Sequence, residues 1–357
     1  MKPTRIIVLA TLLALASCAG SEPAKKDEAP PPPPAAPPTD IKVPTGIEDM
    51  VVPADNPITP EKVELGKMLF FDKRLGKDGK MSCETCHLPE KGWTDGKALS
   101  AKFDGSLNTR HTPTLYNVGF YTSWYWDGRA ATLEGQINAA WGGQMGVSDA
   151  AAKEAVAMTL NGIEGYKMAF NSAMGGDATP DRIVKALATF VRTLRSEDSA
   201  WDKYEKGDRS AVSEEVVKGF EVFSSTDKAQ CTLCHVPPTY TDKTFHNVGI
   251  GTDKEKPDAG RGKILADKQD PGADAMTGAF KTPTMRSITD TAPYFHDGRA
   301  KTLDEAVTLM LKGGIPNAKK DEKLTERKIS AEEKKALMAF LKAISPTPAK
   351  FERPKLP

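Results

Sequence analysis

Two short segments of the chain carry the same arrangement of cysteines and a histidine, CETCH at residues 83–87 and CTLCH at residues 231–235. They hold all but one of the 5 cysteines in the chain. In such a Cys-x-x-Cys-His segment the two thiols form thioethers with the vinyl groups of haem, and the adjacent histidine binds the iron. The sequence therefore predicts two covalently attached haem c groups, one on Cys83, Cys86 and His87 and the other on Cys231, Cys234 and His235.

Two other kinds of site use closely spaced cysteines. A structural zinc site would require the cysteines to converge on one ion, and the histidine after each pair would then be a coincidence. A thioredoxin-like dithiol would require a βαβ setting, of which the sequence shows no sign. Haem attachment remains the favoured interpretation, and it agrees with export because this attachment occurs outside the bacterial cytoplasm.

The N-terminus predicts that export. Lys2 and Arg5 precede an apolar run, residues 6–16, which is too short to span a bilayer and is typical of a secretory signal. The run ends in Leu-Ala-Ser-Cys at residues 15–18, which resembles a bacterial lipoprotein cleavage box. Residues 1–18 are therefore predicted to be a lipoprotein signal peptide, with a lipid anchor on Cys18. The alternative is cleavage after a small residue, with Cys18 lost or spare.

Composition limits the remaining possibilities. At 357 residues the chain is long enough for two domains, and 39% hydrophobic with 27% charged residues fits a soluble globular protein. The formal net charge is +1, and no base-reading motif is present, so nucleic acid is not an expected partner. Residues 19–45 are proline-rich and are predicted to be an extended linker, a spacer rather than a binding motif.

An internal repeat indicates the architecture. "RHTPTLYN" at 110–117 and "WDGRAATLEG" at 126–135 match "KTPTMRS" at 281–287 and "HDGRAKTLDE" at 296–305, in the same order and register, so that Trp126 aligns with His296. Most other segments have helical signals, with helix starts at Thr59-Pro60 and at Ser330 and an apolar helical pattern over 180–195. We expect a mainly α protein of two tandem haem domains related by duplication, residues 46–205 and 206–345, followed by a tail, 346–357.

The chain resembles the bacterial di-haem cytochrome c peroxidases and their MauG-type relatives. The resemblance covers roughly residues 46–345 and is carried by the paired haem motifs, "WDGRA" and "TAPYFHDG" (291–298). It implies that the two tandem domains are cytochrome c-like, with a C-terminal, high-potential haem that accepts electrons, an N-terminal haem where peroxide reacts, and Trp126 between them. It also implies calcium near the domain interface, bound by backbone carbonyls that match Thr291 and Pro293. Relatives often dimerise, so a homodimer is expected.

The resemblance also predicts iron ligands. The distal methionine of the peroxidases follows the histidine of the "APYFH" segment by 14 residues, which is Met310 here, whereas MauG-type enzymes carry tyrosine. His296 is therefore predicted to lie at the cofactor site and Met310 to bind the second iron, which raises its potential. The alternative is that Met310 only packs, and that Met276 or Met285 binds instead.

The first haem site departs from the peroxidases. Their distal histidine corresponds to Phe103, and their glutamate after "WDGRA" corresponds to Gln144, as in MauG-type enzymes. A calcium-binding asparagine corresponds to His111. His111 could bind the first iron, stand in at the calcium site, or be a hydrogen-bonded histidine near the interface, and the last interpretation is favoured. His246 is interpreted as structural or as a surface residue.

The leading hypothesis is reduction of hydrogen peroxide in the periplasm. Electrons from a small redox protein would enter at the His235/Met310 haem and pass through or near Trp126, while Gln144 would orient peroxide at the first haem. Because glutamine cannot shuttle a proton as glutamate does, His111, water or another acid would have to. The alternatives are a MauG-type oxidase that modifies a side chain of a partner protein, and a pure di-haem electron carrier.

Overall fold

The first helix begins where the sequence predicts. This computed structural model describes residues 50, 52–347 and 350–357, all of which belong to one compact unit. Thr59 caps the helix through its side chain, which accepts a hydrogen bond from the backbone N–H of Lys62, and Pro60 occupies the first turn, where its missing N–H costs no hydrogen bond. The predicted signal peptide 1–18, with Cys18, and the predicted linker 19–45 lie outside the described residues.

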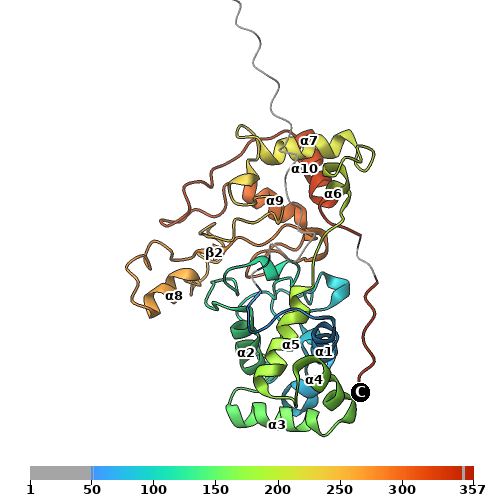
Figure 1. Cartoon of the computed structure of the whole chain (residues 1–357). Helices are drawn as coiled ribbons and strands as arrows, with labels where there is room; N and C mark the ends of the chain where they lie inside the picture. Colours follow the sequence, from blue (N-terminus) through green and yellow to red (C-terminus); the bar gives the residue numbers. More distant parts are fainter. Residues whose placement is uncertain (1–49, 51, 348–349) are drawn as a thin grey trace, which may run out of the picture. The chain divides into compact units, whose positions relative to one another are not determined.

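The described part of the chain is mainly helical, as predicted. Figure 1 shows the ten helices with the small amount of sheet beside them. Their bounds are α1 (Pro60–Phe71), α2 (Leu133–Gly143), α3 (Ala150–Asn161), α4 (Glu164–Met174), α5 (Pro180–Arg192), α6 (Ala200–Glu205), α7 (Glu214–Ser224), α8 (Arg261–Asp267), α9 (Leu303–Leu311) and α10 (Ala331–Ala343), with the antiparallel strands β1 (Phe245–His246) and β2 (Phe280–Lys281).

Close packing of α1 against α5 forms the centre of the first half, which extends to residue 205, and the remaining residues are called the second half. Gly66 allows the approach, because a Cβ at this position would lie 2.0 Å from the carbonyl oxygen of Ala186. The apolar face of α5 that the sequence predicts is buried against this neighbour. The turn that carries the CETCH motif packs against α1 of this helix pair.

The second half repeats this arrangement with α7 and α10. A Cβ on Gly219 would lie 2.0 Å from the carbonyl oxygen of Ala336, the same distance as in the first half. Ser330 caps α10 with Glu333 in a reciprocal capping box, which confirms the predicted helix start. Each half therefore presents one tightly crossed helix pair to its own Cys-x-x-Cys-His segment.

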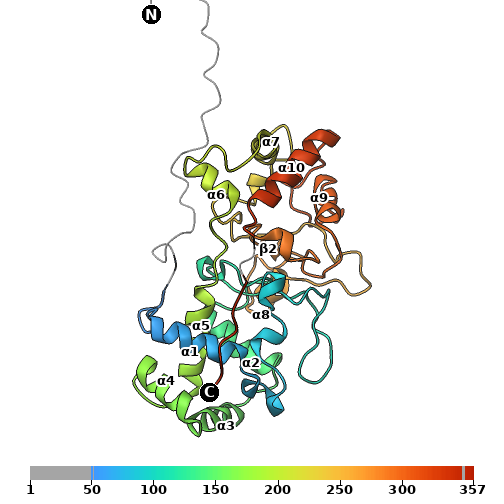
Figure 2. The ribbon, with the colours of Figure 1, turned by 90° about the vertical axis from the view of Figure 1, so that its right-hand side faces the viewer.

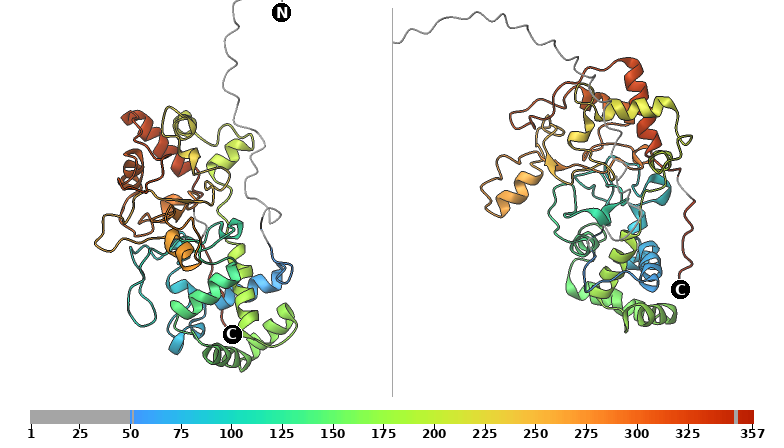
Figure 3. Two further views of the ribbon diagram at one scale, coloured as in Figure 1. Left: turned by 90° about the vertical axis from the view of Figure 1, so that its left-hand side faces the viewer. Right: turned by 45° about the horizontal axis from the view of Figure 1, so that its top comes forward.

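Charged and polar contacts join the two halves. Arg110 of the first half pairs with Asp127 at 2.5 Å and forms two hydrogen bonds to the carboxylate of Asp258 in the second half. The hydroxyls of Ser196 and Ser287 lie 2.7 Å apart in a second such contact. The two views in Figure 3 show the loops around α8 and β2 beside those of the first half.

The C-terminal segment returns to the first half after α10. Figures 1 and 2 show the chain leaving α10 and ending close to α4. Phe351 packs against the core of the first half, and the carbonyl oxygen of Pro357 accepts a hydrogen bond from Arg74 at 3.0 Å. The predicted tail, 346–357, is thus in contact with the first half through its last residues. Among the described helices, none combines the length and the apolar character needed to cross a membrane.

Candidate haem sites

Each Cys-x-x-Cys-His segment winds through one short 3-10 turn. The turns are Cys83–Thr85 and Cys231–Leu233, and the backbone N–H of the following histidine bonds back to the first cysteine, from His87 at 3.1 Å and from His235 at 2.8 Å. None of the four cysteines is in a disulfide. At the second motif, Cys231, Cys234 and His235 line one cavity, an arrangement that fits haem attachment.

A backbone carbonyl fixes the orientation of each histidine. Nδ1 of His87 donates to the carbonyl oxygen of Trp93 at 2.7 Å, and Nδ1 of His235 donates to that of Tyr240 at 2.9 Å. Burial lowers the pKa of His87 to about 4 and lowers that of His235, so both rings are neutral at pH 7. A neutral ring with Nδ1 engaged offers Nε2 to a metal, the usual arrangement of a histidine ligand.

Trp93 and Tyr240 are functional positions that the sequence analysis missed. Both have positive φ, 61° and 52°, a conformation that costs free energy in residues other than glycine, and this conformation turns their carbonyls toward the histidines. A signal was present: each is an aromatic residue followed by Thr-Asp, six residues after His87 and five after His235.

A large, mostly apolar cavity lies beside the second motif. Cys231, Cys234 and His235 line it together with Met310, and Met285 and His296 line it as well. Nε2 of His296 is buried without a hydrogen-bond partner, and its ring stacks on Phe280 with centroids 3.6 Å apart. Met276 is 37% exposed and is not among the lining residues. Met310 and Met285 are therefore the methionines that the fold offers at this site.

Trp126 lies where the two halves meet. Its indole N–H donates to the carbonyl oxygen of His111 at 2.9 Å, and its ring centroid is 6.4 Å from that of His296. Its own carbonyl oxygen accepts the backbone N–H of Lys281 at 2.7 Å. Trp126 also lines the second cavity, so it is in contact with residues of both halves.

A short chain of polar contacts runs from the side chain of Gln144 to the segment that follows the first motif. The side-chain Nε2 of Gln144 donates weakly to Asn108 at 3.4 Å, Asn108 donates to the carbonyl oxygen of Ser100, and the hydroxyl of Ser100 lies 2.5 Å from that of Thr112. Oε1 of Gln144 is buried and has no partner. Phe103, 38% exposed, lies against Gly146 and under the ammonium of Lys77.

His111 is a buried histidine at the contact between the halves. Its Nδ1 donates to the carbonyl oxygen of Lys97 at 2.7 Å, and the carbonyls of Ala98 and Thr291 also face the ring. Burial lowers its pKa, which keeps the ring neutral. This arrangement favours the third interpretation, a hydrogen-bonded histidine near the interface. Thr291 faces this histidine, and calcium at Thr291 and Pro293 stays a prediction.

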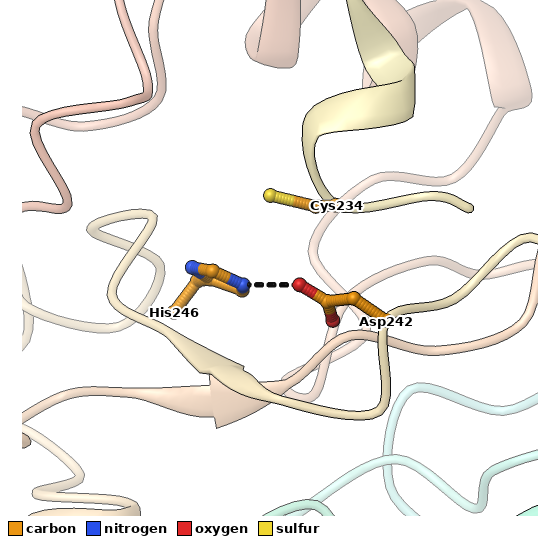
Figure 4. Close-up of side chains that lie close together, drawn as sticks. All are labelled: Cys234, Asp242 and His246. Atoms are coloured by element: carbon orange, nitrogen blue, oxygen red, sulfur yellow. Dashed lines mark hydrogen bonds and ion pairs between the residues drawn. The ribbon is translucent and has the colours of Figure 1, made fainter.

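Cys234, Asp242 and His246 converge beside the second motif, as Figure 4 shows. Both ring nitrogens of His246 are engaged, Nε2 with Asp242 at 2.8 Å and Nδ1 with Asp321 at 2.5 Å. The hydrogen bond to Cys234, then these two carboxylates, raise the pKa of His246 to about 10, against the opposing effect of burial. A ring with both nitrogens hydrogen-bonded to carboxylates has no free lone pair for a metal, which favours the structural interpretation of His246.

Comparison with known proteins defines the family. A family profile described as "Di-haem cytochrome c peroxidase" matches residues 60–210. The "Methylamine utilization protein MauG" of Methylorubrum extorquens is 37% identical over 87% of this chain and 85% of that protein. The "Cytochrome c551 peroxidase" of Nitrosomonas europaea is 33% identical over 84% of this chain and 85% of that protein. The chain belongs to the di-haem cytochrome c peroxidase family, and it is an oxidoreductase of that family.

Solved structures agree with this assignment. The crystal structure of "a MauG-like protein associated with microbial copper homeostasis" has a TM-score of 0.73 at 28% identity, covering 83% of this chain and 93% of that one. The di-haem peroxidase BthA of Burkholderia thailandensis shares the fold, with a TM-score of 0.69 at 19% identity over 84% of this chain and 92% of that one. The resemblance predicted from the sequence is confirmed.

Proposed function

We propose that this protein reduces hydrogen peroxide to water in the periplasm, with electrons from a small redox protein such as a cytochrome c or a cupredoxin. Its two halves are a duplicated pair of cytochrome c-like domains, each carrying one haem c on its own Cys-x-x-Cys-His segment. When bound, these haems supply one-electron chemistry and an iron at which peroxide binds. Free cysteines, oriented neutral histidines and an apolar cavity fit such groups.

The observation that carries this proposal is the difference between the two sites. His235 and Met310 both line the second cavity, and they are the two side chains that would bind the iron of the second haem. At the first site, Phe103 stands where the peroxidases carry their distal histidine, and the remaining sequence candidate, His111, is held at the contact between the halves. Phe103 has no donor atom, and Nδ1 of His111 is bonded to a carbonyl. With His111 kept in this hydrogen-bonded role, the first iron would have room for peroxide, and the second would handle electrons.

Side chains of the first site assign the remaining roles. Oε1 of Gln144 is buried without a partner and can accept a hydrogen bond from the O–H of peroxide. Because a neutral amide does not act as a general acid or base, the protons for water formation come from solvent or another acid. Trp126 lies in contact with both halves and is positioned to assist electron passage between them.

A second candidate is the MauG-type oxidation of a side chain on a partner protein. Gln144 favours it, since this glutamine replaces the glutamate of the peroxidases, whereas Met310 opposes it. Both kinds of relative match this chain at similar identity, 37% and 33%.

One experiment separates these functions. Haem-loaded protein without its lipid anchor is mixed with hydrogen peroxide and reduced cytochrome c, once fully oxidised and once half-reduced. Rapid cytochrome oxidation in both samples supports a peroxidase with an open first haem. Turnover only after half-reduction indicates that a ligand blocks the oxidised iron. A lasting spectral response to peroxide without turnover favours the oxidase, and no response at all favours an electron carrier.

A further inference from the structure

The last residues of the chain form a strap, residues 350–357, on the first haem site. Phe351 stacks on Phe71 with centroids 5.4 Å apart and an interplanar angle of 23°, and it meets Trp93 edge-on at 5.0 Å. The ammonium of Lys67 lies 5.1 Å from the centre of the Phe351 ring. An aromatic side chain from the far end of the sequence therefore completes the core around Trp93.

The strap also binds the motif itself. The guanidinium of Arg353 pairs with Glu84, which stands between the two cysteines of the first motif, and with Glu90 at 3.0 Å. Further along, Arg74 bonds the carbonyl oxygen of Pro357, and Pro357 lies against Gly165. The strap is thus attached at two further points beyond Phe351, by Arg353 to the haem-attachment turn and by Pro357 to Arg74 and α4.

Trp93 is the residue through which this contact can reach the iron. It holds a positive φ of 61°, which costs free energy unless the surroundings enforce it, and its carbonyl oxygen accepts the Nδ1–H of His87. Its indole is confined by Phe70 of α1, Phe190 of α5 and Phe351 of the strap. Phe351 is thus one of three aromatic side chains that pack around the indole and hold Trp93 in this backbone conformation.

In the second half, side chains of α7 and α10 confine the residue that corresponds to Trp93. Tyr240, the counterpart of Trp93, also has positive φ and is confined by Phe223 of α7 and Phe340 of α10. Phe223 and Phe340 occupy the positions that Phe70 and Phe190 occupy in the first half. Contact with the C-terminal strap is therefore a feature of Trp93 and not of Tyr240. The second haem site can serve as an internal reference when the strap is changed.

We propose that the strap is a positioning element of the first haem site, in which Phe351 and Arg353 hold the orientation of His87 through Trp93 and the attachment turn. This inference rests on the proposed function for the presence of haem at His87. The strap follows α10 of the second half and contacts Glu84 of the first motif. A change in the position of one half relative to the other would therefore also change the first site.

The test uses the haem-loaded chain and three variants. Phe351→Ala removes the ring, Arg353→Glu places like charge against Glu84 and Glu90, and Glu352→Ala is the control, since Glu352 is exposed beside both. Resonance Raman and electron paramagnetic resonance spectra report the iron–histidine bond and spin state of each haem without peroxide. We expect shifted signals of the first haem in the first two variants, unchanged signals of the second haem, and wild-type spectra for the control. Peroxide turnover should fall on the order of tenfold, the usual effect of losing an outer partner of a ligand.

Conservative replacement completes the test. Phe351→Tyr keeps the stacked ring and should restore the first-haem spectrum. Unchanged spectra of both haems in Phe351→Ala and Arg353→Glu would overturn the proposal, and so would equal changes in both haems. If Phe351→Ala fails to fold, Arg353→Glu decides by the same criteria, because its exposed ion pairs add little to stability. These spectra require no turnover, so a folded two-haem protein without peroxidase activity would refute the proposed function and leave this inference testable.

Discussion

The backbone carbonyl of Trp93 lies 2.7 Å from Nδ1 of His87, and that of Tyr240 lies 2.9 Å from Nδ1 of His235. Both aromatic residues adopt a left-handed backbone conformation, and both are buried against the crossed helix pair of their own half. The fold thus devotes two strained positions to orienting two histidines. What differs between the halves is the side chain available beyond the histidine, since Met310 lines the cavity of the second half and the first half carries the buried amide oxygen of Gln144.

Met310 should set the potential of one haem. Replacing it by leucine removes the thioether that we assign to the second iron, so the reduction potential of that haem should fall. Spectroelectrochemical titration measures both haems in one sample. Met276→Leu is the matched control, because Met276 is exposed and lies outside the cavity. A fall in Met285→Leu instead would transfer the ligand role to Met285.

Gln144 should matter for peroxide and not for the electron donor. Gln144→Leu removes the buried amide oxygen, and kcat/KM for peroxide should fall about 100-fold, the scale for losing one oriented hydrogen bond at a reacting centre. Reduction of the protein by cytochrome c should stay at the wild-type rate. Asn138→Ala, an exposed change on α2, the helix that ends at Gln144, is the control. Equal peroxide kinetics in Gln144→Leu and wild type would remove Gln144 from the mechanism.

The fully buried pair of Arg286 and Asp202 should be a major contributor to stability. Arg286 forms two hydrogen bonds to this carboxylate, at 2.6 and 2.7 Å, and both side chains are 0% exposed. Arg286→Met leaves a buried carboxylate without its partner, which should cost about 3–5 kcal/mol of unfolding free energy. Denaturant unfolding measures the loss. Lys263→Met breaks an exposed pair with Asp267 and should cost at most about 1 kcal/mol.

The same pair should give a pH dependence of known sign. Burial tends to raise the pKa of Asp202, but the hydrogen bonds and charge of Arg286 prevail and hold it below its ordinary value of 3.8. A depressed folded pKa stabilises the protein above pH 3.8, and this contribution disappears as the pH falls through the folded pKa. The gap in unfolding free energy between wild type and Arg286→Met should therefore be largest at neutral pH and should shrink below pH 3.8. A gap that grew in acid would contradict this assignment.

Gly66 should tolerate no side chain. Its added Cβ would overlap the backbone of Ala186, so Gly66→Ala must separate α1 from α5 and should destabilise the protein by at least about 1–3 kcal/mol. Gly143→Ala is the matched change, since Gly143 lies at the end of α2 with open space around it and should lose nothing measurable. Thermal unfolding of the two variants compares them directly.

Local signals in the sequence were sufficient for part of this structure. Thr59-Pro60 and the Ser330–Glu333 capping box predicted two helix starts, because a cap is decided within four residues. The two haem motifs are equally local, and their spacing identified both histidines. These features required no knowledge of which segments meet in space.

Long-range contacts escaped the sequence analysis. Phe351 reaches Trp93 across most of the chain, and nothing in the composition of the last residues indicated a return to the first half. The environment of His111 depends on the carbonyl of Lys97, and that of His246 on Asp321, neither of which a linear pattern can show. Side-chain roles at this site were therefore left as alternatives until the backbone was placed.

The central claim is that peroxide reacts in the first half while electrons enter in the second, and two variants test it most directly. Cys83→Ala with Cys86→Ala removes the first haem attachment, and Cys231→Ala with Cys234→Ala removes the second. Each variant is mixed with peroxide alone and with reduced cytochrome c alone, and the haem spectrum is followed. The account predicts that the first variant accepts electrons but ignores peroxide, and that the second responds to peroxide but no longer oxidises cytochrome c. The opposite pattern, or a peroxide response in both variants, would contradict it.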